Sequence, residues 1–188
     1  MSTLETNLIQ PSTGTTLTLG ASGDTITVPS GVTIAGGLAN TPAFEAYLGT
    51  SQTVTDLVTT KVQFDTEVFD TDNCYDNTTN YRFTPTVAGK YFVYAKVSTD
   101  TIAGANLDQV RIVIQKNGSA ISQANLDARG NTLGSWYTAN DSTTVDMNGT
   151  TDYLEISCRI DDTSGNPDFL GNATIRNTSF GAYKLIGA

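Results

Sequence analysis

The chain has 188 residues, a net charge of −9 and only 15% charged residues, which is enough for one ordinary domain with an appendage. A strongly negative chain repels a phosphate backbone, so nucleic acid is excluded as a favoured partner, and the low charge with abundant Thr argues against disorder. No stretch approaches the ~20 apolar residues of a membrane span, and the N-terminus has neither the basic nor the apolar region of an export signal.

Residues 1–40 differ in character from the rest of the chain. They contain no aromatic residue, no Lys and no Arg, whereas all seven Phe, all eight Tyr and the single Trp lie in residues 41–188. Alternating Thr and apolar residues predict three short strands, over residues 16–19, 25–28 and 32–34, with Gly, Ser and Pro turns between them. We therefore predict two domains, a β-rich stem over residues 1–40 and a head over residues 41–188.

The apolar stripes of the stem are too small to be buried within one chain. They predict packing around a threefold axis shared by three copies, or the addition of strands to the edge of a partner. A flexible Ser/Thr/Gly linker is the third interpretation, and the alternation argues against it. The side chains expected to make these contacts are Leu17, Leu19, Ile26, Val28, Val32 and Ile34.

From residue 43 onward the hydrophobic period is two, which predicts about ten strands of a sandwich or jelly roll. Residues 90–97 carry large side chains on both faces, which predicts a central strand covered on both sides. Asn117-Gly118 predicts a two-residue hairpin turn, and Asn148-Gly149 marks a similar turn. The predicted strands are residues 44–49, 58–64, 80–84, 90–98, 108–116, 119–126, 134–145, 152–161, 173–178 and 180–186.

The two cysteines lie far apart in the sequence. Cys158 falls in an apolar predicted strand and shares a face with Leu154, Ile156 and Ile160, while Cys74 falls in a polar loop. Two free thiols are the expected state, and sequence alone leaves a bridge between them open. The chain has no Cys-x-x-Cys motif and no Cys/His cluster, so a zinc site is not expected.

The sequence lacks most catalytic chemistry. It has no histidine, which excludes Ser-His-Asp and Cys-His nucleophilic sites, and it has neither a dinucleotide-binding glycine motif nor a P-loop. A glycosidase that works with two carboxylates is the one enzyme class left open. Because the acidic residues fall mostly in predicted loops, we predict that the protein is not an enzyme.

Two further candidate sites remain. Asp161, Asp162 and Asp168 lie in the densest acidic loop and offer carboxylates to Ca²⁺, or else they build a solvated turn; no other cofactor is expected. Trp136 and Tyr137 are a candidate surface for stacking a sugar, or else aromatic residues of the core or of an interface.

Six spaced residues in the head resemble the signature of the C1q domain. They are Phe64, Asp70, Tyr75, Phe83, Gly89 and Tyr91. The match has one extra residue before Phe83, and Val93 and Ala95 stand where the family has aromatic residues. The Lys-Asn-Gly ending of residues 110–119 and the C-terminal residues 179–186 are also similar, so the likeness covers about residues 43–188.

This resemblance implies an all-β, C1q/TNF-like jelly roll of about ten strands that assembles as a homotrimer. It implies binding rather than catalysis, and some relatives bind Ca²⁺ near the apex of the trimer. It assigns no ligand residues to this chain, because the loops do not match residue by residue.

The stem resembles a different group. Residues 14–31 are similar to segments that open virion structural proteins of marine tailed bacteriophages, ahead of variable heads. The two resemblances together indicate a trimeric virion surface protein: a fibre, a spike or a capsid decoration. In this hypothesis residues 1–40 bind other virion proteins, and the head contacts a host glycan or receptor or stabilises the particle. The alternatives are a free C1q-like glycan-binding lectin or adhesin and, on the same scaffold, a glycan depolymerase. Neither nucleic acid nor membrane insertion is expected.

Overall fold

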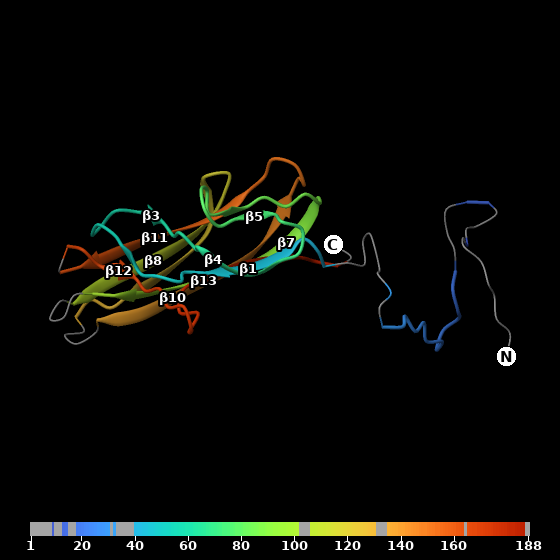
Figure 1. Ribbon diagram of the computed structural model, residues 1–188, viewed down its shortest axis with the longest axis horizontal. Helices are drawn as coiled ribbons and strands as arrows, with labels where there is room; N and C mark the ends of the chain where they lie inside the picture. The colour runs from blue at the N-terminus through green and yellow to red at the C-terminus, as the bar shows by residue number, and fades with distance from the viewer. Residues whose placement is uncertain are drawn as a thin grey trace. The chain divides into compact units, whose positions relative to one another are not determined.

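The computed structural model describes residues 9, 13–14, 18–30, 32, 40–101, 106–130, 135–163 and 165–186. The chain divides into two compact units, Met1–Ile34 and Ala35–Ala188, and each is described by itself (Figure 1).

The described part of the first unit contains a turn but no strand. Asp24 closes the turn, because its carboxylate accepts a hydrogen bond from Ala21 N at 2.6 Å and its own N–H donates to Ala21 O at 3.0 Å. The strand predicted over residues 25–28 is not formed within one chain, since none of the described residues pairs with it. The predicted stem residues Leu17 and Ile34 lie outside the described residues.

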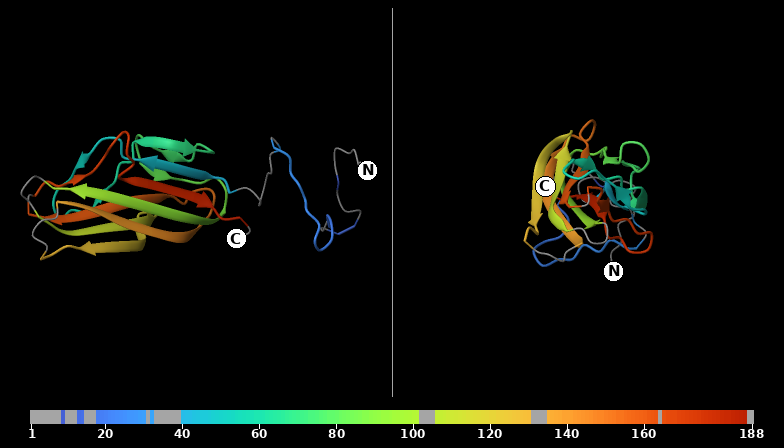
Figure 2. Two further views of the ribbon diagram at one scale, coloured as in Figure 1. Left: turned by 90° about the horizontal axis from the view of Figure 1, so that it is seen from below. Right: turned by 90° about the vertical axis from the view of Figure 1, so that its left-hand side faces the viewer.

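The second unit is a sandwich of two antiparallel sheets built from thirteen strands among the described residues (Figures 1 and 2). The seven-stranded sheet comprises β1 (Ala43–Tyr47), β2 (Gln52–Thr53), β4 (Thr66–Asp70), β7 (Gly89–Asp100), β10 (Trp136–Met147), β12 (Asp168–Phe169) and β13 (Ser179–Lys184). The six-stranded sheet comprises β3 (Thr60–Lys61), β5 (Tyr75–Asp76), β6 (Arg82–Phe83), β8 (Leu107–Lys116), β9 (Ser119–Asp127) and β11 (Leu154–Asp162).

Strand β7 is the centre of the seven-stranded sheet, as the sequence predicts. It pairs with β10 along one side and with β13 and β12 along the other. Strand β1 lies between β13 and β4, so segments from both ends of the head are neighbours in one sheet. This topology leaves β10 as an edge strand, because β7 is its only partner among the described strands.

The six-stranded sheet contains the predicted hairpin. β8 pairs with β9 around Asn117 and Gly118, whose φ angles of 53° and 78° fit the left-handed turn that favours these residue types. β11 pairs with β8 on the opposite side, so β9 is an edge strand. The Asn148-Gly149 segment is instead a longer connection that carries the chain from β10 in one sheet to β11 in the other.

Aromatic residues fill the space between the sheets. The ring of Phe44 stacks on those of Tyr75 and Phe83 at centroid distances of 4.6 and 4.5 Å, and Phe180 meets Phe44 edge-on at 4.8 Å. These rings come from four separate segments, and three of them are fully buried. Cys158 belongs to the same core with Leu154, Ile156 and Ile160, which confirms the predicted inward face of β11.

One predicted strand of the head is not formed, and β4 is the longest observed strand that lies outside the predicted ranges. Residues 173–178 are not a strand, because the side chain of Asn172 accepts the N–H groups of Thr174 and Ile175 at 2.8 and 2.7 Å and forms a turn. Strand β4 was not predicted, because it lacks an alternating apolar stripe. Its place at the edge beside β1 supplies the hydrogen bonds instead.

Candidate binding and assembly surfaces

The two sides of β7 differ in burial. Tyr91, Val93 and Val97 point into the sandwich and are fully buried, whereas Phe92 and Tyr94 point outward and are only half-buried. The expectation that both sides of this strand are covered is therefore met on one side only within a single chain. The outward side of the seven-stranded sheet is the first candidate surface.

A cluster of aromatic rings lies on this outward side. Phe92 is 6.3 Å from Tyr94 and 5.5 Å from Tyr183, measured between ring centroids. Tyr183 and Phe69 remain 38% and 45% exposed. We call the surface formed by Tyr47, Phe69, Phe92, Tyr94 and Tyr183 the aromatic face.

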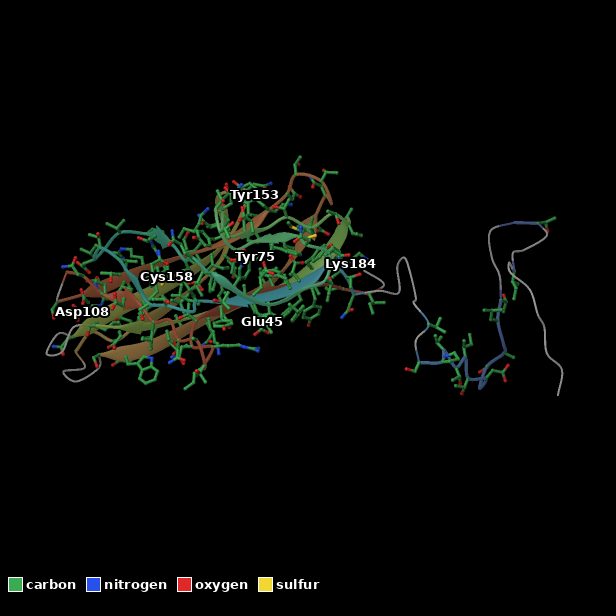
Figure 3. The ribbon with its side chains drawn as sticks, in the orientation of Figure 1. Glu45, Tyr75, Asp108, Tyr153, Cys158 and Lys184 are labelled. Atoms are coloured by element: carbon green, nitrogen blue, oxygen red, sulfur yellow. The ribbon has the colours of Figure 1, made fainter. Side chains whose placement is uncertain are left out.

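Glu45 is the charged centre of the aromatic face, and Figure 3 labels it on β1. The hydroxyl of Tyr94 donates to Glu45 Oε2 at 3.1 Å, and Arg176 Nη1 donates to Glu45 Oε1 at 3.0 Å. The guanidinium of Arg176 also lies 5.9 Å from the ring centroid of Tyr47. Burial, and then the Glu45 charge, raise the pKa of Tyr94 well above its usual range, so its hydroxyl stays a donor.

Gly181 lets Tyr94 lie flat across β13. A side chain at this position would overlap the hydroxyl end of the Tyr94 ring, so only glycine leaves room for it. The aromatic face therefore depends on a residue that carries no side chain itself.

A groove of about 680 Å³ opens beside the cluster. Glu45, Phe92 and Tyr94 line one part of it, and Asn140 and Ser142 from β10 line another. Lys96 also lines the groove, and in the described part of the chain its ammonium group has no ion pair. The groove thus combines aromatic rings with amide, hydroxyl and charged groups.

The second candidate surface is the side of the sandwich where the edge strands β9 and β10 lie next to each other without pairing (Figure 2). Apolar side chains from both strands pack against the core but remain partly exposed there. Ser122 Oγ donates to Asp141 Oδ1 at 3.0 Å and links the two strands. We call this the open edge; its apolar residues are Ala124, Leu126, Tyr137 and Val145.

The structure separates the two predicted sugar-stacking residues. Trp136 is 60% exposed and points outward from the seven-stranded sheet. Tyr137 points to the opposite side and packs against the core, where it lines a cavity of about 430 Å³ with Leu126 and Arg129. The two rings therefore do not form one stacking surface.

The predicted calcium residues are held in different ways. Asp162 is buried, its backbone N–H donates to Asp56 Oδ1 at 2.8 Å, and its carboxylate accepts a hydrogen bond from Gly165 N at 3.0 Å, as in an Asx turn. Asp161 and Asp168 are half-buried on β11 and β12. Among the described residues no group of three or more Asp, Glu or Cys side chains is close enough to share a metal ion. Calcium binding stays a prediction.

Both cysteines are buried free thiols. Burial raises the pKa of Cys158 to about 12 and also raises the pKa of Cys74, so neither is an activated nucleophile. The described residues contain no helix that is long and apolar enough to cross a membrane.

Sequence reasoning did not find the Glu45 cluster. Its three polar residues are Glu45 on β1, Tyr94 on β7 and Arg176 in the turn before β13, and only sheet pairing brings them together. The one sequence feature that indicates this surface is the second row of large side chains in residues 90–97. It predicts that the outer side of the strand is covered, but it does not identify the covering partner.

Comparison with known proteins shows the fold. No family model matches the sequence, and no curated protein matches it. Among solved structures, the Eiger TNF of S. frugiperda is similar, with a TM-score of 0.55 and 12% identity over 80% of this chain and 96% of that chain. Murine APRIL is similar with a TM-score of 0.53 and 11% identity, over 76% of this chain and 99% of that chain. The predicted all-β, C1q/TNF-like jelly-roll fold is confirmed.

Proposed function

We propose that the protein is a non-enzymatic, homotrimeric structural protein of a tailed-phage virion surface, attached through residues 1–40 and displaying the jelly-roll head. The observation that carries the proposal is the aromatic face, which the single chain leaves partly exposed around Phe92, Tyr94 and Tyr183. Exposed apolar surfaces of this kind mark sites of interaction.

A second copy of the chain is the partner that fits. The head has two different unpartnered apolar surfaces, the aromatic face and the open edge. Placing the open edge of one copy against the aromatic face of the next covers both surfaces. Such a contact is heterologous, and repeated around an axis it closes into a ring. The resemblance to the C1q domain implies that the ring has three members.

The stem supports attachment to a partner. Leu19, Ile26, Val28 and Val32 are all exposed in the single chain, although the alternation with Thr is typical of a strand with one buried side. Their burial requires a surface outside this chain: the stems of two further copies, or another virion protein. The resemblance of residues 14–31 to the opening segments of virion proteins supports the second partner.

Display of the head in many copies would serve adhesion or particle stabilisation. Three weak sites on one trimer, repeated over a particle, bind a surface more tightly than one site does. This role needs no catalytic group, in keeping with the absence of histidine from the sequence.

Light scattering tests the trimer. The full chain is expected at the mass of three chains of 19.9 kDa each at micromolar concentration. Phe92→Asp is expected to give monomers, because it places a charge in the aromatic face. Val58→Asp is the matched control, since Val58 is 50% exposed on a loop away from both surfaces, and it should remain trimeric. A monomeric wild type, or equal loss of assembly in both variants, would contradict the proposal.

Electron microscopy tests the location. Purified virions labelled with an antibody against residues 41–188 are expected to carry label at regular surface positions. Addition of a chain lacking residues 1–40 should give trimers that do not join the particle. Unlabelled virions, or normal incorporation of the truncated chain, would overturn the assignment.

A further inference from the structure

The chain contains ten Lys and Arg residues, and all of them are described. Six form ion pairs with Asp or Glu in the described part of the chain. The cations without an ion pair are Lys96, Arg111, Arg159 and Lys184. In a chain with a net charge of −9, unpaired cations need an explanation.

Two of these cations face each other. Arg111 of β8 and Arg159 of β11 are directly opposite in the register of the six-stranded sheet. Both point away from the core, because their neighbours Ile112, Cys158 and Ile160 are the buried residues. Opposite residues of an antiparallel pair have Cβ atoms about 5 Å apart, and like charges placed in this way are destabilising. We call these two residues the arginine pair.

Arg159 is held in place by neutral groups. Its Nε donates to the backbone oxygen of Leu57 at 3.0 Å, and its Nη1 donates to Gln109 Oε1 at 3.4 Å. Neither partner cancels its charge. The guanidinium is therefore oriented by the protein and keeps its remaining donors for another molecule.

Arg111 is half-buried and gives the stronger evidence that an anionic partner is missing. Its Nε is buried and has no hydrogen-bond partner among the described residues, and no carboxylate there lies within ion-pair distance. A buried donor without a partner is costly, since it has lost water without gaining an acceptor. An anion bound from outside would remove the repulsion between the two arginines.

The surroundings define the size of that acceptor. Asn125 of β9 is exposed directly opposite Arg111 and offers a neutral amide. The next row along the sheet is acidic, because Asp161 and Asp127 lie on either side of Gln109 in the register. An extended polyanion would meet these carboxylates, whereas one anionic group flanked by hydroxyls would meet the arginines and the amides.

We propose that the arginine pair binds the oxyanion of an acidic sugar, either its carboxylate or its sulfate ester. Guanidinium groups bind such oxyanions through paired N–H donors, and Gln109 and Asn125 are placed to bind neighbouring hydroxyls. Asp108, labelled in Figure 3, lies near one end of β8; Arg111 is on the same strand, and Arg159 is opposite it on β11. The site is complete within one chain, so it depends neither on the proposed trimer nor on attachment to a particle.

Calorimetric titration of the full chain at constant ionic strength tests the site. The probes are methyl glucuronide, glucose 6-sulfate, inorganic sulfate and the neutral methyl glucoside. At least one acidic sugar is expected to bind more tightly than inorganic sulfate, with no detectable binding of the neutral glucoside. Arg111→Gln and Arg159→Gln are each expected to weaken the acidic sugar by about tenfold or more. Two variants are used so that the test does not depend on one of them folding, and circular dichroism checks the folding of each.

Lys90→Gln is the matched control. It removes the same charge, but Lys90 is exposed on the seven-stranded sheet and paired with Asp146 at 2.7 Å, so affinity should stay within about twofold. Three results would overturn the proposal: no binding of either acidic sugar, equal binding of the neutral glucoside, or equal weakening in all three variants. Inorganic sulfate that binds as tightly as both acidic sugars would also overturn it, since the site would then take a free ion.

Discussion

The two sides of the seven-stranded sheet use the same kind of residue for different ends. On the inner side, Phe44 and Phe180 are fully buried. Phe44 stacks on Tyr75 and Phe83 of the opposite sheet, and Phe180 meets Tyr75 edge-on. On the outer side, Phe92 and Tyr183 also contact each other, yet Tyr183 remains 38% exposed. Apolar area removed from water stabilises the fold only where the chain itself removes it. The inner rings therefore contribute to the stability of the fold, and the outer rings remain available for assembly.

Replacing one ring on each side tests this difference between inner and outer rings most directly. Phe44→Ala is expected to cost about 3–5 kcal/mol of unfolding free energy, because it leaves a cavity among stacked rings. Phe92→Ala should cost far less within a single head, and its effect should appear as dissociation on dilution. Urea unfolding measures the free energy of unfolding, and light scattering over a range of concentrations measures dissociation. Equal losses of folding stability would show that the outer rings belong to the fold.

Asp152 offers an interaction confined to one chain, so its loss should affect folding without a specific effect on assembly. Its carboxylate accepts hydrogen bonds from Asn117 Nδ2 at 2.8 Å and from Asn148 N at 2.9 Å, and pairs with Lys116 Nζ at 2.8 Å. It thereby joins the β8–β9 turn to the connection between the sheets. Asp152→Ala is expected to cost about 1–3 kcal/mol at pH 7, measured by urea unfolding.

The same residue predicts an acid dependence. The hydrogen bonds from Lys116 and then Asn117 lower the pKa of Asp152 in the folded chain. Its contribution is therefore present above the unfolded pKa near 4 and is lost as the pH falls through the folded value. The difference in unfolding free energy between wild type and Asp152→Ala should shrink as the pH falls below about 4. A constant difference would mean that the carboxylate charge is not involved.

Tyrosine ionisation tests the inner and outer sides of the sheet at high pH. Burial raises the pKa of Tyr91 on the inner side and of Tyr94 on the outer side well above their usual range. Their stabilisation is present below the unfolded pKa of about 10 and is lost as the pH rises through the folded values. Tyr94→Phe, which removes the hydrogen bond to Glu45, is expected to cost about 1 kcal/mol at pH 8 and less above pH 10.

Absorbance at 295 nm during an alkaline titration gives the readout. Tyr91 and Tyr94 should ionise only as the chain unfolds, and Tyr94→Phe should remove one of these delayed steps. A Tyr94 that ionises near pH 10 in the folded chain would place it in water, contrary to its bond with Glu45.

The smallest effect on stability is expected in the stem. Ile26→Asp should change the unfolding free energy of the head by less than about 0.5 kcal/mol, because Ile26 is 63% exposed and lies in a separate unit. Under the proposed virion role, the same change should abolish attachment to the particle in a sedimentation assay. Thr27→Asp is the control, because Thr27 lies on the other side of the predicted strand. It should reduce attachment less than Ile26→Asp does.

Much of the fold could be read from local patterns. The Asn117-Gly118 turn, the inward face around Cys158 and the central position of β7 each follow from period-two alternation or from turn residues. Strand β4 and the turn at Asn172 could not be read in this way. The first depends on the neighbouring strand β1, and the second on a side chain that captures backbone N–H groups.

The candidate surfaces were less predictable for the same reason. Trp136 and Tyr137 are adjacent in sequence, but a strand sends neighbouring side chains to opposite sides, and one packs against the core while the other is exposed. The arginine pair is separated by nearly fifty residues in the chain, so its existence depends on the register between β8 and β11.

The sequence alone determined that this is an all-β chain with a distinct N-terminal segment and without histidine chemistry, because composition and alternation act locally. Only the tertiary structure decided which of two apolar rows on β7 is buried, which strands remain edges, and which charged groups lack a partner. Those outcomes depend on pairing between distant segments, and the register of that pairing is set by the packing of the whole sandwich.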